Sequence, residues 1–198
     1  ILTMEQERPI FLGELHVKEN RISYVGESLT ADSPLVKNTI WGREINADGN
    51  VIMPGFKNTH THSAMTFLRS YADDLPLLDW LNQQVFPMEA KLTEEDIYHL
   101  TKLGIMEYLT SGITANFDMY LTPDSIAQAT EECGFRTVMV GGLNNFSQSF
   151  EKLEEWYNKY NDPEKLVTFQ FGFHAEYTNS LDNMKRLSEL IHKYEAPI

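Results

Sequence analysis

The stretch that decides the fold reads VIMPGFKNTHTH and runs from Val51 to His62. An apolar segment turns at Pro54-Gly55, resumes, and ends on two histidines separated by one residue. We expect a strand here, in which side chains at i and i+2 point to the same face, roughly 6.6 Å apart. Two imidazoles at that spacing can bind one metal ion at about 2 Å each. The pattern predicts His60 and His62 as half of a metal site; the alternative is two histidines at an ordinary strand end.

Composition narrows the class of protein. The chain has 198 residues, of which 42% are hydrophobic and 12% aromatic, as expected for a globular protein with a packed core. Its net charge of -13 argues against a nucleic-acid partner, because that field repels a phosphate backbone. Cys133 is the sole cysteine, which excludes an intrachain disulfide and a thiolate metal cluster. No apolar run approaches ~18 residues and no signal-peptide pattern opens the chain, so we expect a cytoplasmic protein without a membrane partner.

The first 50 residues differ in pattern from the rest. Residues 9–26 read as a β-hairpin that turns at Glu19-Asn20-Arg21. Residues 30–50 are polar and rich in turn-forming residues around a short expected strand near Thr39-Ile40-Trp41. We therefore expect residues 1–50 to form a small β unit, separate from residues 51–198.

From Val51 onward, strand and helix patterns alternate. The expected strands cover residues 51–62, 113–119, 137–143 and 166–174, and the expected helices cover 75–85, 93–111, 122–134, 150–162 and 180–194. This alternation predicts a parallel sheet covered by helices, either an open doubly wound sheet or a barrel. No Gly-rich phosphate motif follows any strand, so nucleotide binding has no support. In both architectures the chemistry lies at the carboxyl ends of the strands, where His60, His62 and His174 fall.

The residues around the two histidines resemble a known family. The motifs that carry the resemblance are Pro54-Gly55-Phe56, Asn58–His62, Met65-Thr66, Leu68-Arg69, Ala72–Leu75, Trp80-Leu81, Phe86–Glu89, Leu92-Thr93, Ser111–Thr114 and Phe117–Tyr120. Together they resemble the amidohydrolase superfamily. The most similar branch holds methylthioadenosine and S-adenosylhomocysteine deaminases, guanine deaminases and triazine chlorohydrolases. The resemblance is dense over residues 51–120 and looser to residue 198.

The resemblance implies a (β/α)8 barrel with a small β-sandwich built from both chain ends. Residues 51–198 would then be the first half of the barrel, since a complete one needs ~250 residues. It also implies one divalent metal, usually zinc, bound by His60, His62, a fifth-strand histidine and an eighth-strand aspartate. The last two ligands and the catalytic glutamate are expected beyond Ile198, so no catalytic residue is expected within this chain. Binuclear members of the superfamily carry a metal-bridging lysine at the end of the fourth strand; this chain has none there, so the resemblance implies a mononuclear site.

The activity implied is that of an aminohydrolase, in which metal-activated water replaces an amino group on a purine nucleoside or related N-heterocycle. The alternatives are a chlorohydrolase or another amidohydrolase acting on an N-heterocycle, and a non-catalytic metal-binding barrel protein. A small molecule is the expected partner, and homo-oligomerisation stays open.

Three residues are expected to bind substrate on the strength of the resemblance. His174 matches a substrate-contacting histidine, Glu89 matches a carboxylate that binds ribose hydroxyls, and Trp80 matches an aromatic that covers the pocket. The alternatives are a loop histidine, a solvated glutamate and a helix-core tryptophan. Where homocysteine-binding members carry arginine, this chain has Val140-Gly141-Gly142, which favours a neutral nucleoside because a substrate carboxylate would lack a bidentate partner.

Overall fold

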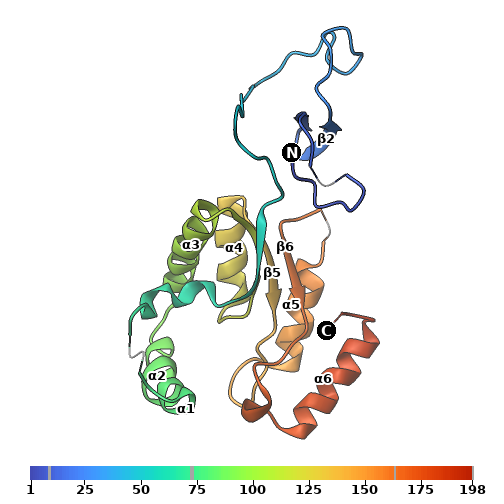
Figure 1. Ribbon diagram of the computed structural model, residues 1–198. Helices are drawn as coiled ribbons and strands as arrows, with labels where there is room; N and C mark the ends of the chain where they lie inside the picture. Colours follow the sequence, from blue (N-terminus) through green and yellow to red (C-terminus); the bar gives the residue numbers. More distant parts are fainter. Residues whose placement is uncertain (9, 72–73, 163, 198) are drawn as a thin grey trace. The chain divides into compact units, whose positions relative to one another are not determined.

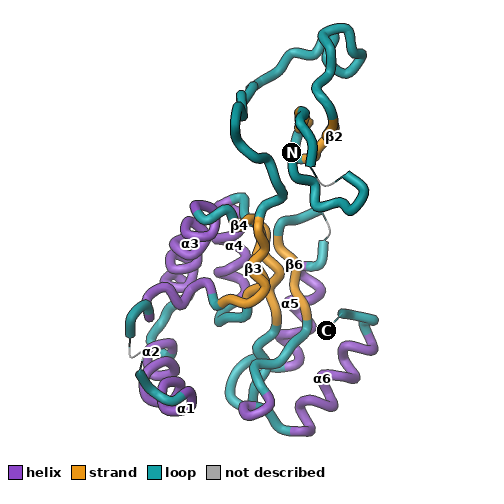
Figure 2. The backbone as a smooth tube through the Cα atoms, viewed as in Figure 1, coloured by secondary structure: helices purple, strands orange, loops and turns teal. Residues whose placement is uncertain are grey.

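The structure is a computed structural model that describes residues 1–8, 10–71, 74–162 and 164–197. The chain divides into two compact units, Ile1–Pro54 and Gly55–Ile198. Figures 1 and 2 trace the backbone of both units. Ala72 and Asp73, which belong to the motifs above, lie outside the described residues. No helix within the described ranges is long and apolar enough to cross a membrane.

The first unit contains the predicted hairpin. Strand β1 (Glu14–Lys18) pairs antiparallel with β2 (Arg21–Gly26), and the turn between them places Glu19 at a positive φ of 57°. The strand expected near Thr39-Ile40-Trp41 is wrong. These residues have no partner strand within the described part of the chain; the Thr39 N–H instead donates to the carbonyl oxygen of Val36 at 2.9 Å, and Ile40 is 97% exposed.

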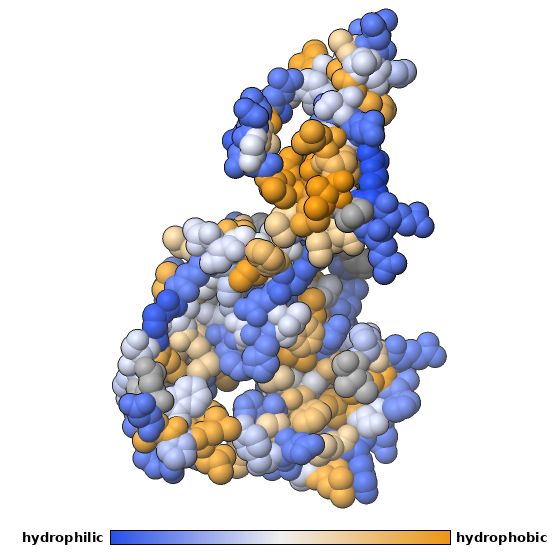
Figure 3. All heavy atoms as spheres, viewed as in Figure 1, coloured by the Kyte–Doolittle hydropathy of each residue, from blue (hydrophilic) through white to orange (hydrophobic). Residues whose placement is uncertain are grey.

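Apolar side chains of the first unit are exposed rather than packed (Figure 3). The large ones include Ile10, Leu12, Val17, Ile22, Leu35, Ile40 and Ile45. Among the described residues of this unit, no apolar side chain is fully buried. A two-stranded sheet without a packed core is marginally stable in water.

The second unit is an α/β structure built on a parallel sheet. Its strands are β3 (Phe56–Thr61), β4 (Ile113–Asp118), β5 (Arg136–Val140) and β6 (Val167–Gln170). They pair in the order β3-β4-β5-β6, which follows the sequence without a reversal. A doubly wound sheet reverses its order at a switch point, whereas sequential right-handed crossovers place all helices on one face. The order therefore favours the barrel over the doubly wound sheet.

The helices after each strand begin and end at locally encoded signals. They are α3 (Glu94–Thr110), α4 (Pro123–Cys133), α5 (Phe150–Tyr160) and α6 (Leu181–Lys193), and α3 to α5 run alongside the strands (Figure 1). Thr93 and Asp96 form a capping box at the start of α3, and the Ser180 side chain caps α6. Gly134 ends α4 at a φ of 64°, a conformation that favours glycine.

The two faces of the sheet differ in burial. Thr137, Met139 and Phe169 are buried on the face covered by helices. Alternate positions such as Val138 and Thr168 point to the other face and are half-buried. The core therefore lies between sheet and helices, and the open face leads to the carboxyl ends of the strands.

Several expectations near the site need correction. The strands expected over residues 137–143 and 166–174 end earlier, at Val140 and Gln170. The strand expected over residues 51–62 is shorter, because pairing with β4 begins only at Phe56 and Pro54 cannot donate a ladder hydrogen bond. The helix expected over residues 75–85 is α1 (Leu77–Trp80), followed by a π-helix, η2 (Leu81–Val85), and by α2 (Phe86–Glu89). Pro87 lacks an N–H and clashes with the preceding turn of an α-helix, which the wider π turn relieves.

Short 3-10 helices follow two of the strands. One, η1 (Ser63–Leu68), begins directly after His62, and the other, η3 (Glu176–Thr178), follows His174. Both were missed by the periodicity of the sequence, since one or two turns carry too few residues to show a repeat.

Candidate active site at the carboxyl ends of the strands

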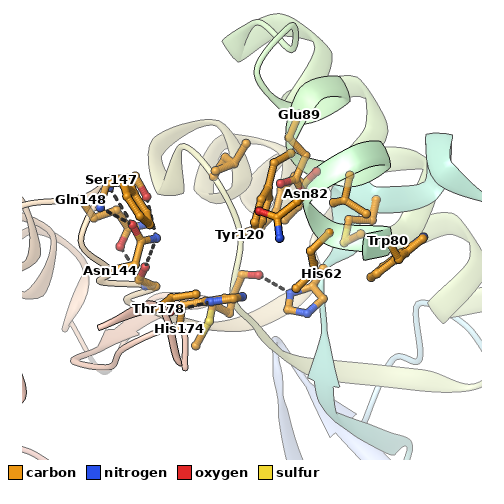
Figure 4. A pocket seen from close by; sticks show the side chains of 18 residues that line it. His62, Trp80, Asn82, Glu89, Tyr120, Asn144, Ser147, Gln148, His174 and Thr178 are labelled. Carbon is orange, nitrogen blue, oxygen red and sulfur yellow. Dashed lines mark hydrogen bonds between the residues drawn. The ribbon is translucent and has the colours of Figure 1, made fainter. Parts of the chain in front are cut away.

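A pocket of about 480 Å³ opens where the parallel strands end (Figure 4). Its lining includes four of the five predicted site residues, namely His62, Trp80, Glu89 and His174. His60 does not line it. The π-helix and α2 form one wall, and the segment after β5 forms the opposite wall. The fold thus gathers residues more than a hundred positions apart in the sequence around one cavity.

His62 is held in a single tautomer. Its Nδ1 lies 2.5 Å from the carbonyl oxygen of Met119, the residue that follows β4. Because a carbonyl only accepts, we assign the proton to Nδ1, which leaves the lone pair on Nε2. This arrangement is typical of metal-binding histidines, whose second nitrogen is fixed by a backbone carbonyl.

A register shift in β3 turns the two histidines to the pocket face. The ladder between β3 and β4 is irregular between Asn58 and Thr61. The Thr61 hydroxyl lies 2.5 Å from the hydroxyl of Tyr108 on α3, so Thr61 points to the helix face. Its neighbours His60 and His62 therefore point to the other face.

The donor set fits part of a metal site. The rings of His60 and His62 have centroids 5.5 Å apart and planes at 74°, so both can reach one ion between them. No group of three His, Cys, Asp or Glu side chains that could hold a metal occurs among the residues the structure describes. The described residues therefore bring two imidazole rings near one another, and a metal site would need further ligands.

Among the described residues, His174 has no hydrogen-bond partner for its Nε2. Its Nδ1 lies 3.0 Å from the Thr178 hydroxyl, which itself donates to the Ala175 carbonyl oxygen at 3.0 Å. The Thr178 oxygen must then accept from His174, and we assign the proton to Nδ1. Burial lowers the pKa of His174, and the nearby His62 acts in the same direction, so the ring is neutral at pH 7.

Glu89 and Tyr120 share the wall beside His62 (Figure 4). Burial raises the pKa of Glu89, and the Tyr120 hydroxyl and His62 partly offset this. Burial and the Glu89 charge together raise the pKa of Tyr120, which stays a neutral hydroxyl. That hydroxyl is buried and has no partner at hydrogen-bond distance among the described residues. The pair therefore presents a donor and an acceptor to a ligand.

The opposite wall is neutral and held by its own turn. Asn144 accepts from the backbone N–H groups of Phe146 and Ser147 at 2.8 and 2.7 Å. The Gly142 N–H donates to the Gln148 side-chain oxygen at 2.8 Å. No lysine or arginine occurs among the described residues that line the pocket.

Sequence reasoning assigned no role to Tyr120, Asp118 or the Asn144–Gln148 turn. Asp118 is 1% exposed at the end of β4; burial raises its pKa to about 6, although hydrogen bonds from Ser63 lower it. The signal that was present is position: each is a polar residue at or just beyond the carboxyl end of a strand, where active-site groups concentrate.

Comparison with known proteins decides the family. A model described as "Amidohydrolase family" matches residues 51–198. The chain belongs to the amidohydrolase family. Metal ligation is typical of that family, and the His60–His62 pair is the part of this amidohydrolase that suits it.

Curated relatives of this amidohydrolase bear a specific name. A 5-methylthioadenosine/S-adenosylhomocysteine deaminase of Caldicellulosiruptor saccharolyticus is 37% identical over 202 residues, covering 100% of this chain and 46% of the relative. A protein of the same name from Desulfitobacterium hafniense is 38% identical over 182 residues, covering 89% and 41%. The chain thus spans about half the length of the curated relatives it matches.

Solved structures share the fold. An adenosine deaminase of Xanthomonas campestris with bound zinc matches with 33% identity and a TM-score of 0.67, over 73% of this chain and 35% of that one. A triazine hydrolase variant matches with a TM-score of 0.81 over 98% of this chain and 49% of that one. Its identity of 17% makes it a likeness of fold alone.

Proposed function

We propose that this amidohydrolase chain is the metal-binding half of a zinc-dependent aminohydrolase that removes the amino group of a purine nucleoside. The observation that carries the proposal is the convergence of His62, Glu89 and His174 on one pocket, with the Nε2 atoms of both histidines free. The curated relatives, which are deaminases by name, support the same reaction class.

In this proposal His60 and His62 hold one zinc ion, and ligands from outside residues 1–198 complete its coordination. Bound zinc would lower the pKa of water and supply the attacking oxygen. The zinc in the related adenosine deaminase supports this choice of metal. The carbonyl of Met119 keeps His62 in the tautomer that can bind the ion.

The remaining residues would bind and orient the substrate. His174, neutral at pH 7, accepts a hydrogen bond at Nε2 from an N–H of the purine. Glu89 accepts from the ribose hydroxyls, and Tyr120 donates to one of them. Trp80 covers the apolar side of the pocket, where its ring excludes water from the base.

The neutral wall bears on the choice of nucleoside. A substrate carboxylate would need a cationic or bidentate partner, and the described lining contains neither lysine nor arginine. The amides of Asn144 and Gln148 suit an uncharged substituent instead. A neutral purine nucleoside, such as 5′-methylthioadenosine, is therefore favoured over S-adenosylhomocysteine.

The proposal includes the rest of the fold. The sequential sheet β3-β4-β5-β6 would be the first half of a (β/α)8 barrel. The first unit, with its exposed apolar side chains, would be part of a β-sandwich that other chain segments complete. We infer a cytoplasmic protein whose partner is a small molecule.

The test is the ultraviolet change from adenine to hypoxanthine when 5′-methylthioadenosine is added to the zinc-loaded, full-length protein. Conversion with release of ammonia is the expected result, and S-adenosylhomocysteine should react more slowly. Release of chloride from a chlorotriazine without deamination would replace the aminohydrolase by a chlorohydrolase. Zinc binding without turnover of any N-heterocycle would leave a non-catalytic metal-binding barrel.

A further inference from the structure

The end of β4 contacts the His62 turn at two places. The backbone N–H of Ser63 donates to Oδ1 of Asp118 at 3.1 Å, and Nδ1 of His62 donates to the carbonyl oxygen of Met119 at 2.5 Å. Asp118 and Met119 are consecutive. One strand end therefore holds both the imidazole of His62 and the peptide that follows it.

An aspartate at position 118 lowers the stability of the fold, because its carboxylate is buried. It is 1% exposed, and its Oδ2 has no hydrogen-bond partner among the described residues. A buried carboxylate with one unsatisfied oxygen destabilises a fold relative to a well-packed apolar residue. Packing alone therefore gives no reason for an aspartate, whereas its contact with Ser63 does.

The turn that Asp118 holds is closely packed on its other sides. The Ser63 hydroxyl accepts from the Asn116 amide at 3.0 Å and lies 3.1 Å from the Tyr108 hydroxyl. On α3, Gly104 allows close approach, because a Cβ there would lie 2.8 Å from the Ser63 carbonyl oxygen. The peptide after His62 is thus fixed between β4 and α3.

We propose that Asp118 is a positioning residue for His62, acting through the Ser63 N–H so that the imidazole keeps its bond to Met119 and directs Nε2 to the metal. Asp118 touches neither metal nor substrate in this role. The inference rests on the proposed metal site at His60 and His62.

The experiment measures zinc affinity of the full-length protein by chelator competition, together with the absorption spectrum of the cobalt-substituted protein. Asp118→Asn keeps an oxygen that can accept from Ser63, whereas Asp118→Ala and Asp118→Leu remove it. We expect zinc affinity to fall about 10- to 100-fold in the Ala and Leu variants and by less than about threefold in Asp118→Asn. The cobalt spectrum should change in the same two variants only.

Asp118→Leu keeps the branching and the number of side-chain heavy atoms and removes the buried charge, so it tests the proposal even if Asp118→Ala fails to fold. Thr130→Val is the matched control: it removes a buried hydroxyl that lies 3.2 Å from that of Thr137, away from His62, and should leave zinc affinity unchanged. Wild-type affinity in Asp118→Leu would overturn the proposal, as would an equal loss in Asp118→Asn. Failure of the proposed function is seen separately, as absence of zinc binding or deamination in the wild-type protein.

Discussion

The two walls of the pocket are held in different ways. At the β3–β4 end, His62 bonds to a carbonyl 57 positions away, and Ser63 bonds to a carboxylate 55 positions away. In the turn after β5, Asn144 bonds to backbone groups two and three positions away. The first arrangement exists only when the sheet is formed, whereas the second is made by the turn itself. The orientation of His62 thus depends on the tertiary fold, whereas the bonds of Asn144 depend only on its own turn.

The largest effect is expected from a substitution of His62, at the β3–β4 end of the pocket. His62→Ala should abolish stable zinc binding and reduce deamination on the order of 10³-fold. The reason is that the proposed zinc, which would supply several kcal/mol of transition-state stabilisation, loses a ligand. Metal content after dialysis and kcat/KM measure this. His99→Ala, on the exposed side of α3, is the control and should retain both properties. Retained zinc in His62→Ala would place the metal elsewhere.

The β3–β4 end of the pocket, which is held by contacts distant in sequence, should also be sensitive to substitution of Gly104, where α3 packs closely against it. Gly104→Ala places a Cβ 2.8 Å from the Ser63 carbonyl oxygen. Overpacking of this kind costs about 1–3 kcal/mol, more than the ~1 kcal/mol that alanine adds to helix propensity. We expect a net loss in the free energy of unfolding, read from denaturant titration. Met106→Ala, at a position 62% exposed on the same helix, should change it by less than about 0.5 kcal/mol.

The pH dependence of the activity tests the role proposed for His174. Since burial lowers its pKa below the usual 6.5, the neutral ring that binds substrate persists at pH 7 and is lost only on acidification below that value. Below its pKa, kcat/KM should fall about tenfold per pH unit through this group. His174→Gln cannot titrate, so its acid limb should lose one protonation step. An unchanged limb in His174→Gln would show that another group controls it.

The smallest effect is expected in the local turn. Asn144→Ala removes the acceptor for two backbone N–H groups, so KM for the nucleoside should rise about three- to tenfold. The unfolding free energy should change by less than about 0.5 kcal/mol, because the side chain of Asn144 bonds only within its own turn, while Asn145 keeps the bonds that tie this loop to Thr178 and Ser180. Steady-state kinetics and denaturant titration separate the two quantities. Asn158→Ala on α5, which removes a similar side-chain bond away from the pocket, should change neither KM nor kcat. A large loss in the unfolding free energy of Asn144→Ala would show that this turn contributes to the tertiary fold as the β3–β4 end does.

The same distinction explains what sequence alone could predict. The ends of α3, α4 and α6 were predicted correctly, because capping by Thr93, Gly134 and Ser180 involves only neighbouring residues. The alternation of strands and helices predicted the parallel sheet. Because active-site residues gather at the carboxyl ends of parallel strands, the sequence also predicted that His60, His62 and His174 lie at the same end of the sheet.

What sequence could not predict depends on partners far along the chain. The local sequence near Ile40 predicts a strand, but the residues that the structure describes include no partner strand for it. The role of Asp118 depends on the register between β3 and β4, which no local pattern encodes. The π segment arises because Pro87 and the buried side chains Leu81 and Val85 must be accommodated in the same turns.

That π segment has an evolutionary consequence. A π turn holds one residue more than an α turn, so it is created or removed by inserting or deleting a single codon. Deleting one residue between Leu81 and Val85 would convert the π turn into an α turn, and the helix after it would keep the same face toward the pocket. The residue lost would come from the π segment itself, in which Leu81, Asn82 and Val85 line the pocket. The wall can therefore change by one residue in length while Glu89, the sheet and its histidines keep their places.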